Sequence, residues 1–88
     1  MIPSKLLFTV ATVLEAATAV GGADTTICEM EKALRKAQAD LRTELEAIDS
    51  APDSVTRLAA MERWNEAALW AEMLVNGLSD RLNQTIQA

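Results

Sequence analysis

The sequence predicts an all-α protein, and three observations lead to this prediction. Alanine, leucine, glutamate, glutamine, arginine and methionine, which favour helices, dominate the 88 residues. Runs of β-branched residues are missing, and the three glycines stand only at Gly21, Gly22 and Gly77. Apolar residues recur at steps of three and four, the period of an amphipathic helix. We therefore expect one helical domain over residues 1–88, with three helices.

The first predicted helix covers residues 4–20. Ser4 is a candidate N-cap, and Gly21 and Gly22 are a candidate stop. The apolar side chains gather on one side of a helical wheel, and threonines and a glutamate fall on the other side. This pattern is typical of a helix with one buried face. The apolar positions are Leu6, Leu7, Val10, Val13, Leu14, Ala17 and Val20.

The same segment has a second interpretation, as a secretory signal peptide formed by residues 1–19. Lys5 would be its charged region, residues 6–14 its apolar region, and residues 17–19 its small-residue cleavage site. The protein would then be an exported or membrane-associated structural protein, periplasmic or secreted. Glu15 directly after the apolar region argues against this, and the run is shorter than the roughly 20 apolar residues that span a membrane. We expect a cytoplasmic protein without a membrane span.

The second predicted helix covers residues 25–49 and begins with a candidate capping box, Thr26 with Glu29. Part of its apolar stripe repeats every seven residues, which is typical of helices packed along their length. Charges of opposite sign stand four residues apart on the other faces, as in Glu31 and Arg35, so most of them can pair along the helix. We expect those faces to be solvated. The stripe comprises Ile27, Met30, Leu34, Ala37, Leu41, Leu45 and Ile48.

The third predicted helix covers residues 51–87 and begins with a second candidate capping box, Ser50 with Asp53 around Pro52. At about 1.5 Å per residue it should be longer than the second helix and overhang it. Its apolar stripe also approaches a seven-residue repeat, so the two helices should form a long antiparallel hairpin. The stripe comprises Met61, Trp64, Ala68, Ala71, Leu74, Val75, Leu78, Leu82 and Ile86.

The third predicted helix carries a second apolar face beside this stripe. Its large side chains point away from the stripe on the helical wheel and have acidic neighbours. Either the first helix packs over this face, or another chain does. Because tryptophan and methionine are enriched at interface centres, we select the face as the candidate partner-binding site. The candidate residues are Leu58, Glu62, Glu66, Leu69, Trp70 and Met73.

The composition argues against catalysis and metal binding. The chain has no histidine, so the most common general base is missing and the usual zinc ligand sets cannot be built. Cys28 is the only cysteine, which excludes an intramolecular disulfide. Thirteen acidic and eight basic residues give a formal net charge of −5, which disfavours direct binding to nucleic acid. We expect no enzymatic activity and no cofactor.

These observations predict a small acidic helical module that acts by binding another protein, as a homodimer or in a hetero-complex. In one version it is an adaptor or co-chaperone that covers the hydrophobic helix of its partner. In the other it is an inhibitor of the kind that phages and mobile elements carry. Such an inhibitor would occupy a basic surface of a host protein where nucleic acid binds.

Overall fold

The computed structural model describes residues 4–20 and 24–87, and within these residues it contains three α-helices and no β-strand. Helix α1 spans Ser4–Val20, α2 spans Thr25–Ser50 and α3 spans Ser54–Gln87. The prediction of an all-α protein with three helices is confirmed. The molecule is elongated, with extents of 51 × 18 × 16 Å.

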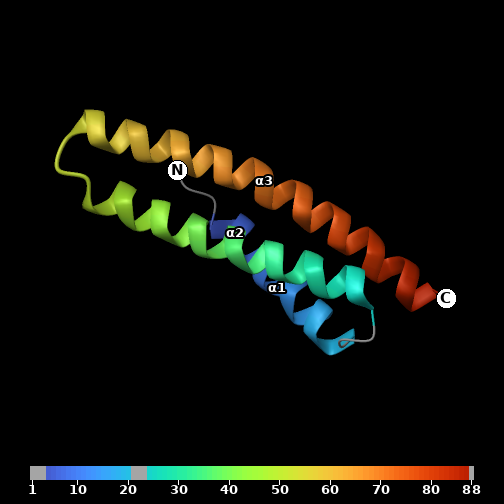
Figure 1. Ribbon diagram of the computed structural model, residues 1–88. Coiled ribbons are helices and arrows are strands. Elements are labelled where there is room, and N and C mark those ends of the chain that lie inside the picture. The colour runs from blue at the N-terminus through green and yellow to red at the C-terminus, as the bar shows by residue number, and fades with distance from the viewer. Residues whose placement is uncertain (1–3, 21–23, 88) are drawn as a thin grey trace.

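Helices α2 and α3 lie side by side and run in opposite directions (Figure 1). With 26 and 34 residues, they are about 39 and about 51 Å long at about 1.5 Å per residue. The last turns of α3 therefore extend past the start of α2. Among the described residues, two ion pairs bridge the helices: Glu44 Oε1 lies 2.9 Å from Arg63 Nε, and Asp24 Oδ2 lies 3.0 Å from Arg81 Nη2.

The seam between α2 and α3 consists of buried apolar residues and follows the seven-residue repeats. In α2 the buried repeat consists of Ile27, Leu34, Leu41 and Ile48. In α3 the buried residues are Ala60, Trp64, Ala68, Ala71, Val75, Leu78 and Leu82. Three of these are alanines, so the two backbones can approach closely. At Gly77 the end of the Met30 side chain lies where a side chain would begin, because an added Cβ would lie 2.9 Å from Met30 Cε.

The repeat fails at one end of the seam. Met61 is 42% exposed, so its predicted place in the core stripe is wrong, and Ala60 is buried instead. A straight α-helix drifts by about 20° per seven residues, and three repeats separate Met61 from Leu82. The resulting rotation of about 60° turns Met61 out of the seam and Ala60 into it. The side chain of Ile86, also assigned to the stripe, lies outside the described side chains.

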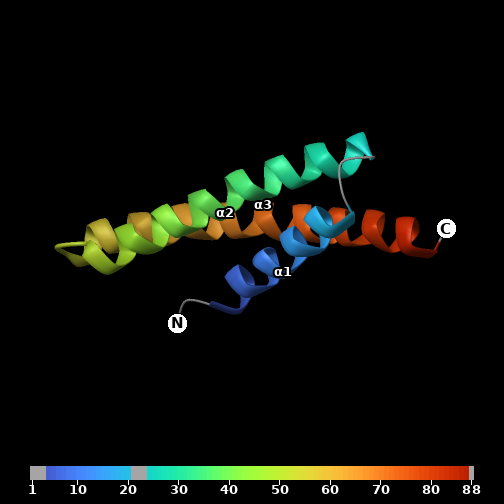
Figure 2. The same cartoon turned by 90° about the horizontal axis from the view of Figure 1, so that it is seen from below.

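Helix α1 crosses the groove between α2 and α3 obliquely (Figure 2). It contacts both helices, and Val10, Leu14 and Ala17 are buried in the common core. These three residues belong to the apolar stripe that the sequence predicts. The first helix is therefore part of the hydrophobic core of the domain.

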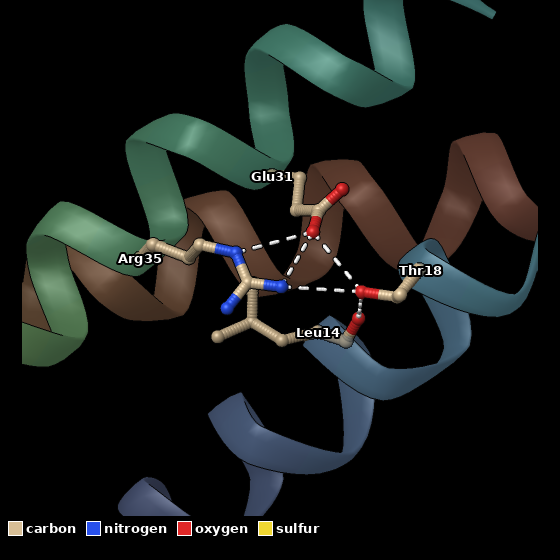
Figure 3. Close-up of polar contacts among 4 residues, drawn as sticks. All are labelled: Leu14, Thr18, Glu31 and Arg35. Carbon is tan, nitrogen blue, oxygen red and sulfur yellow. Dashed lines mark hydrogen bonds and ion pairs between the residues drawn. The ribbon is translucent and has the colours of Figure 1, made fainter. Parts of the chain in front are cut away.

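A polar cluster attaches α1 to α2 (Figure 3). Arg35 Nη2 donates hydrogen bonds to Glu31 Oε2 at 2.7 Å and to Thr18 Oγ1 at 3.2 Å. The Thr18 hydroxyl can donate to Glu31 Oε2 at 3.1 Å or to the carbonyl oxygen of Leu14 at 2.9 Å. The hydrogen bonds from Arg35 and then from Thr18 lower the pKa of the Glu31 carboxyl. The predicted Glu31–Arg35 pair is thus present, and it also binds the neighbouring helix.

Helix α2 begins one position after its cap, Asp24, so the predicted capping box of Thr26 and Glu29 is wrong. Asp24 Oδ1 accepts hydrogen bonds from the backbone N–H groups of Thr26 at 2.9 Å and Ile27 at 3.2 Å. A carboxylate is among the best N-caps because it accepts from these otherwise unpaired donors. The hydrogen bond from Ile27 lowers the pKa of the Asp24 carboxyl, and Arg81 lowers it further.

Helix α3 begins at Ser54, so the second predicted capping box is also wrong. Asp53 Oδ1 accepts from the Thr56 backbone N–H at 2.7 Å, and this bond lowers the pKa of the Asp53 carboxyl. The expected partner, Ser50, belongs to α2 and donates to the carbonyl oxygen of Glu46. Ala51 is extended, with ψ of 128°, because a following proline disfavours the helical region.

Replacing Leu78 with alanine tests the seam. Leu78 is completely buried, so we expect the change to lower the free energy of unfolding by about 2 to 5 kcal/mol. Urea denaturation measures this loss, and Leu41→Ala should give a similar value. Met61→Ala is the matched control on the exposed side and should cost less than about 1 kcal/mol. An equally small loss for Leu78→Ala would place this residue outside the core.

Asp24→Asn tests the ion pair at the open end of the hairpin. Because folding lowers the Asp24 pKa, ionised Asp24 stabilises the fold above its ordinary value of 3.8. That contribution is lost as the pH falls through the lower, folded-state pKa. Asparagine keeps a capping oxygen but has no charge for Arg81. We expect the variant to have a lower Tm than the wild type at pH 7, and the difference to be smaller at pH 2.

Thermal melts followed by circular dichroism at both pH values provide the measurement. Asp40→Asn changes an exposed aspartate of α2 and should leave Tm unaltered at either pH. A difference for Asp24→Asn that is equally large at both pH values would show that the charge of Asp24 does not stabilise the fold.

Candidate functional site

The candidate site is the outer face of α3, the side turned away from α1 and α2. At about 100° per residue, the predicted site residues lie about 110° to 180° from the centre of the buried stripe. Leu69 is 65% exposed, Trp70 is 56% exposed and Met73 is 65% exposed. The other predicted site residues, Leu58, Glu62 and Glu66, are exposed as well.

Helix α1 does not cover this face. It lies in the groove between α2 and α3 and buries its apolar stripe there, while Trp70 stays more than half exposed. The sequence allowed either the first helix or another chain to pack over this face. Packing of the first helix over Trp70 is therefore wrong. Within the part of the chain that the structure describes, no helix packs over the outer face of α3.

Leu69, Trp70 and Met73 form a contiguous surface, which we call the apolar patch. Side chains three and four residues apart are neighbours on a helix, with Cβ atoms about 5–6 Å apart. Met73 follows Trp70 by three residues and Leu69 by four. Leu58 lies on the same face but about 16 Å nearer the start of α3. Glu62 and Glu66 occupy the face between them. The six predicted residues therefore share one face, in two apolar groups with a carboxylate pair between.

Besides Met61, two exposed apolar residues were not predicted as site residues. Val55 is exposed and lies three residues before Leu58, on the same outer face. The steps of three and four that link Leu58 to Met73 extend back to Val55, so the pattern could have found it. Phe8 is exposed on α1, away from its buried stripe. It is the only large apolar residue of the described α1 that is mainly exposed, and it is remote from the apolar patch along the chain.

The charge of the outer face is negative. Glu62, Glu66 and Asp80 are exposed there. Arg63 and Arg81, the arginines of the central and C-terminal parts of α3, instead reach sideways and pair with carboxylates of the α2 segment. Their charges are therefore directed to the seam side of α3. The outer face combines exposed apolar side chains with carboxylates that form no ion pair within residues 4–20 and 24–87.

A concave feature lies on another side of α3, where a cleft of about 400 Å³ separates it from α1. Its lining comprises Lys5, Leu6, Thr9, Trp64, Ala68, Glu72, Val75 and Asn76. Trp64 Nε1 is closed to solvent and has no hydrogen-bond partner among the described residues. Because this N–H group is shielded, it cannot serve a molecule in the cleft. Four other lining residues, Lys5, Thr9, Glu72 and Asn76, are polar.

Other kinds of site can be assessed within residues 4–20 and 24–87. No three cysteine, aspartate or glutamate side chains gather there in a group that could hold a metal ion. In the same ranges, none of the helices combines the length and hydropathy needed to cross a membrane. The most distinctive surface of the described residues is the outer face of α3.

Comparison of the chain with protein-family models, with curated proteins and with solved structures finds no match in any of the three. The function must therefore be inferred from the geometry and chemistry of the outer face.

The two tryptophans should respond differently to a soluble quencher. Trp64 is buried in the seam and Trp70 is exposed, so each can be observed alone in the variant that replaces the other with phenylalanine. The Trp64→Phe variant reports Trp70 alone, and the Trp70→Phe variant reports Trp64 alone. Acrylamide should quench the fluorescence of Trp70 several times more strongly than that of Trp64. Trp70 should also emit at a longer wavelength. Circular dichroism checks that both variants are folded, and equal quenching would mean that Trp70 is covered in solution.

Proposed function

We propose that this protein is a non-enzymatic interaction module that binds another protein through the outer face of α3. The observation that carries the proposal is the exposure of the apolar patch. Its three side chains expose on the order of 400 Å² of mostly apolar surface, a size at which patches on monomeric proteins are often functional. A singly exposed leucine would support no such proposal.

The composition of the face supports a binding role. Tryptophan is enriched among residues whose removal weakens protein complexes most, and such residues are typically surrounded by polar groups that exclude water from the contact. Trp70 has Leu69 and Met73 beside it and Glu66 one turn away. Methionine adapts its flexible side chain to an irregular counterpart. The three-helix core is complete without these residues, so their burial is available to a partner.

The same face suits both versions of the function. An adaptor or co-chaperone would use the apolar patch to cover a hydrophobic helix of its partner. An acidic inhibitor would use the carboxylates around the patch to occupy a basic surface, including one that otherwise binds nucleic acid. The two versions differ in their response to salt, because screening weakens contacts between exposed charges far more than apolar packing.

Trp70→Ala should weaken binding while leaving the fold intact. We expect a loss of about 2 kcal/mol or more in binding free energy, because the change removes the largest side chain of the apolar patch. The purified protein is used to isolate partners from the cells that produce it, and affinities are measured with the recovered partner. Light scattering after size exclusion measures self-association of the same samples.

Phe8→Ala is the matched control, since Phe8 is also an exposed aromatic residue but lies on α1. It should bind as the wild type does, and both variants should keep the wild-type helicity. The proposal fails if Trp70→Ala lowers only thermal stability. It also fails if the two variants bind equally well.

A further inference from the structure

We infer that the partner docks with a basic amphipathic helix, about four turns long, laid along the outer face of α3. Its basic side chains would lie over Glu62 and Glu66, and its apolar side chains would contact Leu58 at one end and the apolar patch at the other. The inference rests on the proposed function, because it names the occupant of the same face.

The arrangement of the face along α3 sets the length and pattern of this helix. From Leu58 to Met73 the face extends for about 22 Å, at about 1.5 Å per residue. A straight helix can follow it over its whole length, since every residue of the face belongs to one helix. Glu62 and Glu66 are four residues apart and therefore lie one above the other. Two basic residues at the same spacing on the partner would meet them.

The charges of α3 favour a basic occupant over an apolar or acidic one. Glu62 and Glu66 are exposed, and Asp80 continues the negative face beyond the apolar patch. Arg63 and Arg81 are held by Glu44 and Asp24 on the side of α2, at 2.9 and 3.0 Å. The outer face thus has carboxylates between and beyond its apolar groups. Opposite charges across an interface speed encounter and select the partner.

A second copy of the chain is the less suitable occupant. Pairing two outer faces would bring Glu62, Glu66 and Asp80 of both copies into one interface. Like charges placed together at an interface oppose association. The net charge of −5 on each chain adds to the repulsion at longer range. A basic helix removes this repulsion and buries the same apolar side chains.

Two synthetic helices test the inference on the intact protein. Each has about 18 residues, enough to match the 22 Å face, with leucines near both ends of one side. The cationic peptide has two lysines, four residues apart, between the leucines, and the anionic peptide has glutamates in their place. Binding is followed by the blue shift of Trp70 emission, and the buried Trp64 supplies a constant background. The cationic peptide should bind about tenfold more tightly, and added salt should reduce this preference.

Charge reversal on the protein provides the decisive variant. In Glu62→Lys/Glu66→Lys the order should invert, so that the anionic peptide binds more tightly. Glu29→Lys/Glu46→Lys makes the same change in net charge on exposed positions of α2 and should retain the preference for the cationic peptide. Circular dichroism confirms that both variants keep the helical fold. Loss of the preference in both variants would mean that net charge alone produces it, and would overturn the inference.

The remaining outcomes separate this inference from the proposed function. If both peptides bind equally and Trp70→Ala weakens both, the interaction face is supported and the basic partner is wrong. If neither peptide binds and the protein self-associates through Trp70, a second copy is the occupant and the basic partner is again wrong. If neither peptide binds and no association depends on Trp70, both the inference and the proposed function are wrong.

Discussion

The packing of large aliphatic side chains of α2 against alanines of α3 is the constraint on which the rest of the structure depends. Leu34 and Leu41 of α2 and Ala68 and Ala71 of α3 are buried in one hydrophobic core, and the small alanine side chains let the two backbones approach closely. On the α3 side, the seam is filled by three alanines together with Trp64, Val75, Leu78 and Leu82. Trp70 and its neighbours are therefore free to lie outside it, where they give the surface its apolar character.

Polar contacts position the helices where apolar packing leaves freedom. Asp24 caps α2 and pairs with Arg81, so one carboxylate fixes both the start of a helix and its alignment with α3. Glu31 and Arg35 pair on α2 and also contact Thr18 of α1. Such exposed contacts individually stabilise a fold only slightly, but they favour one register over its neighbours. The orientation of α1 in its groove thus has a polar as well as an apolar basis.

Sequence periodicity predicts much of this fold because it reports burial along a helix. It places the three helices within a few residues and finds most of the core, including Val10, Leu41 and Leu78. It fails at Met61, where drift over several turns exceeds what a seven-residue repeat can describe. It fails at the caps because an aspartate near each predicted cap, Asp24 or Asp53, accepts hydrogen bonds from the first amides of the helix instead. Periodicity also could not decide whether α1 covers Trp70. It identifies the apolar faces of each helix, but it does not show which faces pack against each other.

The two apolar sides of α3 impose a pattern on how this protein can vary. Between residues 58 and 78, burial in the seam restricts which side chains the inward positions can accept, independently of the function of the protein. The outward positions of α3, by contrast, contribute little to folding, as do the exposed positions of α2. A systematic survey of substitutions scored for abundance alone would find Trp70 and Lys36 about equally tolerant. If the outer face binds a partner in the cell, a survey scored for fitness would find that substitutions on nearly every side of α3 are harmful. Substitutions on the solvent face of α2 would still be tolerated.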